Sequence, residues 1–384
     1  MPGNSSRRMA RDPAGKQRAK QFARKVDADR FASTIEADKL RGTYIDPAAG
    51  KTTRKDYGQQ WLSAQTFDAS TREATELRLR LHVYPHLGGT QLAALRPSQV
   101  QAWLRALQQR LAPRYVRVIF ANLSAVLSAA VDDERLVKNP CRAASVRLPK
   151  LDPTQLQPWV PDEVLAVRRA LPPRFQLLTT LAAGCGLRQG EVFGLAVEDV
   201  DFLRGVVHVR RQVKLLSNRQ VYALPKGRKV RDVPLPESVA LEVAAHLQRF
   251  PAVTVELPWE AVSAEPRPVR LLLSTREQTA LQRNYINAKV WKPALAVAGL
   301  EPNRENGMHA LRHFYASVLL DAGESIRALA EYLGHSDPGF TLRVYTHLMP
   351  ASEERTKRAV DRALSGAAVD GSMSSAPGVH QGAG

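Results

Sequence analysis

The sequence has few cysteines and lacks a long apolar run. Its 384 residues include two cysteines, Cys141 and Cys185, which excludes a disulfide framework and a metal site built from cysteine. No stretch approaches the ~20 uninterrupted apolar residues that a membrane-spanning helix needs. The basic opening, residues 1–16, lacks the apolar segment of a signal peptide. These absences predict a soluble protein of a reducing compartment that does not associate with a membrane.

Acidic residues are also scarce relative to basic ones. The chain has 37 Asp and Glu against 55 Lys and Arg, so its formal net charge is +18. Hydrophobic residues make up 44% of the chain, which is enough for a folded core and excludes a purely disordered basic chain. The length predicts two or three domains. The charge predicts a polyanionic partner, with nucleic acid as the leading class.

Most of the positive charge lies in the first two-fifths of the chain. Residues 1–50 have a net charge of +5, residues 51–150 have +9, and the remaining 234 residues have only +4. A surface that is charged only for solubility mixes both signs throughout. The asymmetry favours a DNA-binding N-terminal part joined to a part with another task, over the alternative of an incidentally arginine-rich composition.

Periodicity indicates a small leading module followed by a helical domain. Residues 1–50 combine a basic, turn-rich opening with a helical period from Asp27 to Leu40. Residues 54–147 have the apolar spacing of amphipathic helices, clearest from Arg114 to Val131. We therefore expect an all-helical, net-basic domain of a size suited to contact a duplex.

The second half of the chain has a mixed pattern. A proline-containing linker at 148–158 precedes it, and the small polar residues 366–384 predict a disordered tail. Between them, at 155–365, the pattern is mainly helical. Helices are predicted at 174–183, 311–321, 325–333 and 338–347. Strands are predicted at 205–210, 220–224 and 229–235, the last two joined by a hairpin turn at 225–228.

Four short segments of this half contain residues typical of catalytic sites. They are 186–191, 225–227, 309–313 and 333–335, with Tyr345 ten residues further on. Each has an ordinary structural explanation when taken alone. An Arg and a Glu three residues apart are most often a surface pair, and a lone Lys in a turn is usually only solvated. Their order along one chain is much more specific.

In this order the segments resemble those of the tyrosine recombinases, in their phage-integrase branch. That family has an Arg at the head of a helix with an acidic residue three positions later, and then a hairpin Lys. A His-x-x-Arg motif, a Leu-Gly-His motif and a Tyr about ten residues later complete the pattern. The matching residues of this chain are Arg188, Glu191, Lys226, His309, Arg312, His335 and Tyr345.

The resemblance covers roughly 54–365 and implies a multidomain fold. It implies a small arm-site DNA-binding module at 1–50 and an all-α, SAM-like core-binding domain at 54–147. A catalytic domain is implied at 155–365, mixed and mainly α, with a small antiparallel sheet.

The resemblance also implies how the site would bind a DNA phosphodiester. Arg188 and Arg312 would hold its non-bridging oxygens, because a guanidinium group matches them bidentately and stays charged at physiological pH. His309 and His335 would donate further hydrogen bonds to the charge that develops in the transition state. The resemblance implies no metal ion and no other cofactor.

Two proton transfers are implied as well. Tyr345 would be the nucleophile, with His309 as the acceptor of its proton, because a phenol with a pKa near ~10 needs help to ionise. Lys226 would be the general acid for the leaving 5′ hydroxyl, with Lys229 as the nearest rival on the same predicted hairpin. Glu191 would orient the site, because a carboxylate facing a phosphate would repel it.

The function that the resemblance implies is site-specific recombination of DNA through a 3′-phosphotyrosyl intermediate, to integrate or excise a mobile element. The expected partners are double-stranded DNA at attachment sites, a homo-tetramer formed on that DNA, a DNA-bending protein and an excisionase. The expected location is the bacterial host cytoplasm, at the nucleoid. A helix at 350–365 is expected to dock on a neighbouring protomer, with packing on its own domain as the alternative.

Three alternatives remain open at this point. An Xer-type recombinase or resolvase would share the chemistry but not the role. A type IB topoisomerase would use similar chemistry on a single duplex. A sequence-specific DNA-binding regulator on an inactive scaffold belongs to a different class, and the complete set of seven residues weighs against it.

Overall fold

In this computed structural model the described residues are 6–11, 17–22, 24–27, 29, 30, 33, 37, 51–151, 157–335, 337–345, 357, 360, 361 and 364. The chain divides into two compact units, Met1–Pro153 and Thr154–Gly384. The division falls inside the predicted linker at 148–158. The predicted tail at 366–384 and most of the predicted helix at 350–365 lie outside the described residues.

The first unit begins with a two-stranded antiparallel ribbon. Strand β1 (Ser6–Arg11) pairs with β2 (Gln17–Phe22), so that Ser6 faces Phe22 and Arg11 faces Gln17. The sequence predicted only a turn-rich segment here. The described residues 25–27, 29, 30, 33 and 37 are helical, within or next to the predicted helical segment. A DNA-binding module at 1–50 stays a prediction.

A helical domain follows. Its helices are α2 (Arg54–Ala64), α3 (Ala69–Arg78), the π-helical segment η2 (Leu79–Gly88), α4 (Pro97–Gln108) and α5 (Pro113–Asp132). Local sequence fixes their starts. At the start of α3 the Asp68 side chain accepts hydrogen bonds from the N–H groups of Ser70 and Thr71. Proline occupies the first position of α4 and of α5, where the missing N–H costs no helical hydrogen bond. The structure confirms that this segment is helical, as predicted.

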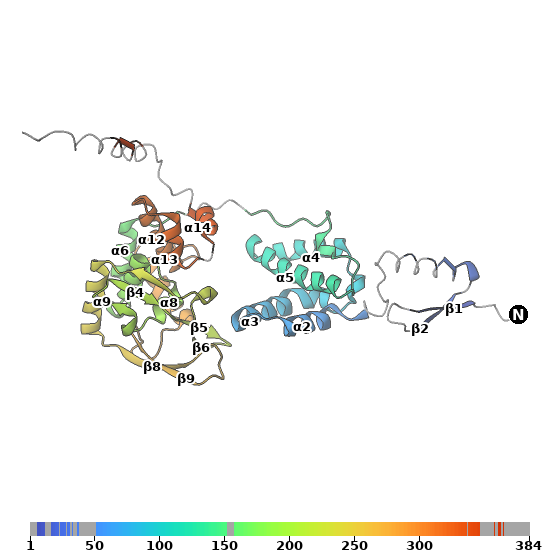
Figure 1. Ribbon diagram of the computed structural model, residues 1–384, viewed down its shortest axis with the longest axis horizontal. Helices are drawn as coiled ribbons and strands as arrows, with labels where there is room; N and C mark the ends of the chain where they lie inside the picture. Colours follow the sequence, from blue (N-terminus) through green and yellow to red (C-terminus); the bar gives the residue numbers. More distant parts are fainter. Residues whose placement is uncertain are drawn as a thin grey trace, which may run out of the picture. The chain divides into compact units, whose positions relative to one another are not determined.

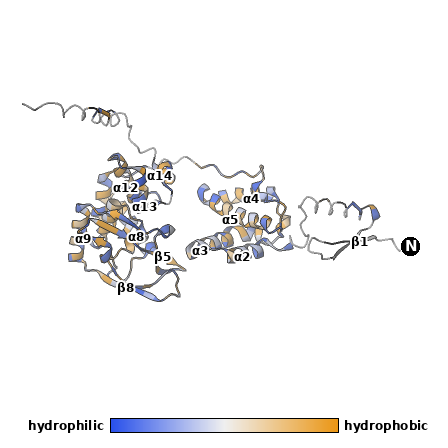
Figure 2. Cartoon of the chain, viewed as in Figure 1, coloured by the Kyte–Doolittle hydropathy of each residue, from blue (hydrophilic) through white to orange (hydrophobic). Residues whose placement is uncertain are grey.

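The core of this domain lies against α5 (Figures 1 and 2). By length and composition α5 would suit a membrane span, in contrast to the expectation from the sequence. Its apolar stripe is instead the domain core, since Val116, Ile119 and Leu127 are fully buried. The indole N–H of Trp103 on α4 donates to the carbonyl of His82 at 2.8 Å, which satisfies the polar atom of this buried side chain.

Two arginines of the helical domain serve its own fold. Arg54 is 3% exposed, and its Nη1 donates to the carbonyl of Gln91 at 2.6 Å. Arg72 donates to the carbonyl groups of Leu62 and Gln65 at the end of α2. Part of the positive charge counted in the sequence is therefore unavailable to a partner. The exposed cations of this domain are Lys51, Lys55, Arg80, Arg96, Arg105, Arg110, Arg114, Lys138, Arg142, Arg147 and Lys150.

The second unit is mixed and mainly helical. Its helices are α6 (Pro161–Ala170), α7 (Gln176–Cys185), α8 (Gln189–Phe193), α9 (Glu237–Arg249), α10 (Arg283–Tyr285), α11 (Lys292–Val297), α12 (His309–Asp321), α13 (Ile326–Leu333) and α14 (Pro338–Tyr345). Helix α7 contacts α6, α8, α9 and α12. Since Leu178 and Leu181 are fully buried, α7 forms the centre of the core, and its C-terminal end leads directly to the candidate site.

Among the described residues of this unit, the strands form three small antiparallel sheets. They are β3 (Val200–Asp201), β4 (Val206–Val209), β5 (Gln212–Leu216), β6 (Arg219–Ala223), β7 (Arg231–Pro234), β8 (Val253–Pro258) and β9 (Pro266–Leu271). The order is β3-β4-β7 in one sheet, and β5 pairs with β6 and β8 with β9 in the others. The β8–β9 ribbon, at the lower edge of the unit in Figure 1, was not predicted from the sequence.

The predicted hairpin around Lys226 is wrong in its pairing. Strand β6 pairs with β5 through a two-residue turn at Ser217 and Asn218, whose φ angles are 47° and 61°. Positive φ at both central residues is typical of a tight hairpin turn. Strand β7 pairs with β4 instead. Lys226 therefore lies in a loop between strands of two different sheets, because the unpredicted strand β5 takes β6 as its partner.

Gly186 ends α7 in a conformation and a space that admit no side chain. Its φ is +61°, and a Cβ atom there would lie 2.4 Å from Cδ1 of Tyr315 on α12. Its carbonyl accepts a hydrogen bond from Arg312 at 2.6 Å. This glycine therefore couples the end of the central helix to a candidate site residue.

We expect Gly186→Ala to lower the free energy of unfolding by about 2–5 kcal/mol, because left-handed backbone costs about 1–2 kcal/mol and overpacking about 1–3 kcal/mol. Gly299→Ala is the matched control, since Gly299 has a φ of +76° but a Cβ atom there would meet no other atom within 4 Å. It should cost only the backbone part, about 1–2 kcal/mol. Urea unfolding of the two variants measures the difference, and equal losses would contradict the packing argument.

Candidate active site

The candidate site is organised around the C-terminal end of α13. Gly334 ends this helix in the left-handed region, with φ of 62°, and the N–H of His335 donates back to the carbonyl of Ala330 at 2.9 Å. This Schellman arrangement turns the chain sharply. A helix C-terminus has a partial negative charge that favours cations. The carbonyl groups of Tyr332, Leu333 and Gly334 are consecutive at this end. Each accepts a hydrogen bond from a different arginine.

Arg312, on α12, is held by the ends of two helices. It is 1% exposed, and its Nη1 donates to the carbonyl of Gly186 at 2.6 Å. Its Nη2 donates to the carbonyl of Leu333 and lies 3.2 Å from Nε2 of His335. Burial and the charge of Arg188 lower the pKa of Arg312 to about 9. The guanidinium therefore stays charged at neutral pH, and its plane is fixed before any ligand arrives.

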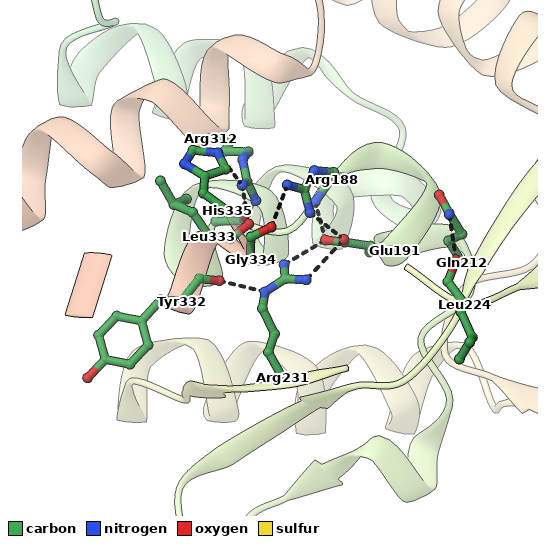
Figure 3. A network of polar contacts seen from close by, with 11 residues as sticks. Arg188, Glu191, Gln212, Leu224, Arg231, Arg312, Tyr332, Leu333, Gly334 and His335 are labelled. Atoms are coloured by element: carbon green, nitrogen blue, oxygen red, sulfur yellow. Dashed lines mark hydrogen bonds and ion pairs between the residues drawn. The ribbon is translucent and has the colours of Figure 1, made fainter. Parts of the chain in front are cut away.

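Arg188 is fixed by a buried carboxylate (Figure 3). It precedes α8, and its Nη1 donates to Oε1 of Glu191 at 2.8 Å while its Nη2 donates to the carbonyl of Gly334 at 3.3 Å. The backbone N–H of Arg188 donates to Oε2 of Glu191 at 2.8 Å. The Arg188 side chain is 19% exposed, so it is less deeply buried than Arg312, which is 1% exposed.

Glu191 is bound on its other side by Arg231 of β7. Nη1 and Nη2 of Arg231 donate to Oε1 and Oε2 of Glu191 at 3.0 and 2.7 Å, and both side chains are essentially unexposed. Burial alone would raise the pKa of Glu191, but the hydrogen bonds and charge of Arg231, with the charge of Arg188, lower it to about 2. The carboxylate is therefore ionised at neutral pH.

The contacts of His335 fix its tautomer. A guanidinium group only donates hydrogen bonds, so Nε2 of His335 must accept from Arg312. Its Nδ1 then carries the proton and donates to Oγ1 of the fully buried Thr341 at 2.7 Å. Burial and the charges of Arg312 and Arg188 lower the pKa of His335 to about 3, so this ring is neutral.

Tyr345, the last residue of α14, is buried against a histidine that the sequence reasoning set aside. Its side chain is 1% exposed, and its hydroxyl lies 2.7 Å from Nδ1 of His313. His309 packs edge-on against His313, with ring centroids 4.6 Å apart. His313 is therefore the histidine next to the expected nucleophile, whereas the sequence analysis expected His309 to accept the proton of Tyr345. The signal in the sequence was the spacing of four, which puts both rings on one face of α12.

Surrounding groups shift the pKa values of these three side chains apart. Burial raises the pKa of Tyr345 to about 12, although the charges of Arg312 and Arg188 oppose this. Burial, with the charges of His309 and Arg312, lowers the pKa of His313 to about 3. His309 lies at the start of α12 and is exposed. Desolvation by the surrounding protein, together with the charges of Arg312, Arg188 and Lys226, lowers its pKa to about 4. The phenol therefore keeps its proton in the free protein.

The two lysines of the β6–β7 loop differ in their contacts. Nζ of Lys229 donates to the carbonyl of His335 at 3.4 Å, next to the three carbonyls that bind arginines. Lys226 is exposed, and within the described part of the chain no hydrogen bond or ion pair holds it. The amide of Gln212 anchors the start of this loop by donating to the carbonyl of Leu224 at 2.7 Å (Figure 3). Lys226 is therefore free to reach a ligand, whereas Lys229 already has a partner.

The structure thus gathers most of the predicted residues around one helix end. Direct contacts join Arg188 to Glu191 and Arg312 to His335, and the adjacent carbonyl groups of Gly334 and Leu333 hold the two arginines near each other (Figure 3). His313 connects Tyr345 to His309, and the charge of Lys226 acts on His309. Sequence reasoning missed His313 and Arg231. Two guanidinium groups beside a phenol and neutral imidazoles form a site that can bind a phosphodiester and supply a nucleophile to it.

Two family models match the chain. The model described as "Phage integrase family" matches residues 162–352, and the model described as "Phage integrase central domain" matches residues 55–146. Together they span the helical domain and most of the second unit.

Proteins with similar sequences include recombinases and integrases. A "Tyrosine recombinase XerC-like" protein of Caldanaerobacter subterraneus subsp. tengcongensis is 28% identical over 281 residues, which cover 69% of this chain and 70% of that protein. The integrase of Mycobacterium phage L5 is 25% identical over 318 residues, covering 82% of this chain and 80% of that integrase.

Solved structures with a similar fold include those of two integrases. The Tn1549 transposon integrase in complex with a circular intermediate DNA aligns with a TM-score of 0.67 at 18% identity, covering 81% of this chain and 99% of that one. A λ integrase tetramer bound to a Holliday junction aligns with a TM-score of 0.59 at 15% identity, covering 88% and 91%. These likenesses establish the fold.

The lowered histidine pKa values predict a stability that falls on acidification. An unfolded histidine titrates near ~6.5, whereas the folded values for His309, His313 and His335 are about 4, about 3 and about 3. Between pH 7.5 and 5 the unfolded chain takes up protons that the folded chain does not, so the free energy of unfolding decreases. Urea unfolding at both pH values measures this, and the decrease should be smaller for His313→Gln. A stability that is flat or rises toward pH 5 would contradict the lowered pKa values of these three rings.

Proposed function

Because this chain belongs to the phage integrase family of tyrosine recombinases, it is a site-specific DNA recombinase, and we propose that it integrates and excises a mobile element with Tyr345 as its nucleophile. The family establishes the reaction class, in which DNA strands are cleaved and rejoined. The assignment of roles to individual residues is our proposal. We assign phosphate binding to Arg188 and Arg312, and general acid catalysis to Lys226.

One observation supports this assignment most strongly. Arg188 and Arg312, which are 124 positions apart, donate to the adjacent carbonyl groups of Gly334 and Leu333, so their guanidinium groups lie side by side. Two such charges next to each other are costly unless an anion joins them. A phosphodiester has two non-bridging oxygens that could each accept from one guanidinium, which suits it to this pair.

The reaction that we propose is a transesterification. Oη of Tyr345 attacks the scissile phosphorus, and the new P–O bond forms as the bond to the 5′ oxygen breaks. The phenol proton passes to a histidine, and Lys226 protonates the leaving 5′ oxygen. The product is a 3′-phosphotyrosyl link and a free 5′ hydroxyl. Attack by a 5′ hydroxyl on this link reverses the step, so rejoining needs no ATP.

We propose that His313 accepts the proton of Tyr345 in the first step, since its Nδ1 lies 2.7 Å from the hydroxyl. In the free protein the pKa of Tyr345 is about 12 and that of His313 about 3, so the proton stays on the phenol. A bound phosphate adds negative charge, which raises the pKa of nearby imidazoles. His309, exposed beside His313, and His335 would then donate hydrogen bonds to the phosphate oxygens, with His309 as the alternative acceptor.

DNA binding would involve both units. The exposed cations of the helical domain supply phosphate contacts, which position the protein on the duplex without reading its sequence. The module at 1–50 would bind arm sites. By analogy with the λ integrase tetramer on a Holliday junction, we propose that four protomers act on two paired attachment sites. A DNA-bending protein and an excisionase would assist, and the reaction would occur in the cytoplasm of a bacterial host, at the nucleoid.

A second candidate role within the same class is that of an Xer-type recombinase. The similarity to the XerC-like protein of Caldanaerobacter supports it. Substrates distinguish the two roles. An integrase recombines two different sites, one from the element and one from the chromosome, whereas a resolving recombinase joins two copies of one site. A type IB topoisomerase would instead relax a plasmid that contains neither site.

We expect Tyr345→Phe to abolish a covalent protein–DNA adduct, because phenylalanine has no oxygen to form the ester. The substrate is a nicked duplex containing the presumed core site from DNA that flanks the gene, and the readout is an adduct that survives denaturation. Tyr332→Phe is the matched control, since this tyrosine lies on α13 with its ring directed away from the arginines (Figure 3). An adduct with Tyr345→Phe would contradict the assignment. No adduct from any variant, with DNA binding intact, would favour the inactive regulator.

A DNA substrate with sulfur in place of the bridging 5′ oxygen at the scissile phosphate distinguishes Lys226 from Lys229 as the general acid. A thiolate leaves without a proton, because a thiol has a pKa near ~8.5, so a missing general acid matters much less. We expect Lys226→Ala to cleave the oxygen substrate roughly 10²–10⁴-fold more slowly, the usual contribution of a general acid, and to recover on the sulfur substrate. Lys229→Ala should show no such sulfur rescue. Rescue of Lys229→Ala instead would transfer the role to Lys229.

A further inference from the structure

We propose that Arg231 is a positioning residue for recombination, which acts through Glu191 and the end of α13 to aim Arg188 at the scissile phosphate. The proposal rests on the proposed role of Arg188 as a phosphate ligand. Arg231 does not itself face a ligand, because its side chain is 1% exposed. Its side chain bonds Glu191, which also holds Arg188, and the Tyr332 carbonyl, which precedes the two carbonyls that hold Arg312 and Arg188.

The first connection is through Glu191. Its carboxylate accepts four hydrogen bonds: two from Arg231 at 2.7 and 3.0 Å, one from Nη1 of Arg188 at 2.8 Å, and one from the backbone N–H of Arg188 at 2.8 Å. Both oxygens are therefore shared between the two arginines. Because Arg231 binds them as a rigid fork, it fixes the plane of the carboxylate, and that plane sets where Nη1 of Arg188 lies.

The second connection is through the end of α13. Nε of Arg231 donates to the carbonyl of Tyr332 at 2.6 Å, while the next two carbonyls accept from Arg312 and Arg188. Arg231 thus holds the same helix end that orients both other guanidinium groups (Figure 3). Gly334 makes this approach possible, because a Cβ atom there would lie 3.0 Å from Cδ of Arg231.

The backbone of Arg231 is itself fixed by a sheet. Arg231 begins β7 and faces Val209 of β4 in the antiparallel register. Its side chain points to the buried face that Val233 shares. The three-stranded sheet therefore sets the position of the fork. A charged group on a core face requires a buried counter-charge, and Glu191 supplies it.

The chemistry of arginine is essential to this role. A lysine at 231 would keep the charge, but its single ammonium group could not make the two parallel bonds to Glu191 and the separate bond to the Tyr332 carbonyl at the same time. Loss of groups that orient a ligand-binding residue typically costs 10–100-fold in activity in well-studied metal sites. We expect Arg231→Lys to slow single-turnover cleavage by roughly the same factor, while affinity for the DNA site changes little.

A double-mutant cycle tests the proposal. The variants are Arg231→Lys, Arg188→Lys and the double variant, each assayed for single-turnover cleavage of the nicked core-site duplex with protein in excess. If Arg231 acts by positioning Arg188, the double variant should cleave at most about threefold more slowly than Arg188→Lys. In that background the guanidinium group that Arg231 positions has already been removed. If Arg231 only supports the fold, the two losses should multiply, and that outcome overturns the proposal.

Further variants keep the test decisive. Arg211→Lys is the matched control, because Arg211 also pairs with a buried carboxylate, Asp199, at 2.6 Å but has no contact with the site arginines among the described residues; it should cleave within about twofold of the native rate. If Arg231→Lys fails to fold, Glu191→Asp replaces it, since the shorter carboxylate retains the charge but retracts from both arginines. If Arg188→Lys itself cleaves at the native rate, the proposed role of Arg188 fails, and that result is distinct from multiplying losses.

Discussion

The site depends on how one buried carboxylate and one helix end hold several positive charges together. Arg188, Arg231 and Arg312 would repel one another if nothing lay between them. Glu191 binds two of them, and the carbonyl groups at the end of α13 bind all three. The protein thereby fixes the guanidinium groups before DNA binds, so the cost of ordering them is part of folding and not of catalysis.

The same packing keeps the phenol of Tyr345 protonated in the free protein. Tyr345 is buried, its pKa is raised to about 12, and its neighbour His313 has a pKa of about 3. Neither value suits proton transfer at neutral pH. A bound phosphate would change this, because its negative charge stabilises protonated imidazole and offsets the repulsion between the arginines. In the proposed mechanism, activation would therefore require bound DNA.

The sequence predicted the helices well where local signals were strong. Apolar spacing of three and four placed α5, and the ordered motifs identified the family. It did not predict Arg231, because an arginine on an alternating strand is ordinarily on the solvent face, and its buried partner Glu191 lies 40 positions away. It also missed β5, although the segment Gln212–Leu216 begins with the alternation of polar and apolar residues that is typical of a strand. His313 was set aside because only the fold shows Tyr345 packed against it. Roles within the site stay predictions.

The most direct measurement is to identify the amino acid that becomes linked to DNA. The native protein would be trapped on the nicked core-site duplex, digested with protease and nuclease, and the modified peptide sequenced by mass spectrometry. The account predicts a nucleotide attached through its 3′ phosphate to Tyr345. Attachment to another residue, such as Tyr315 or Tyr332, would contradict the site described above, and attachment through a 5′ phosphate would contradict the proposed direction of cleavage.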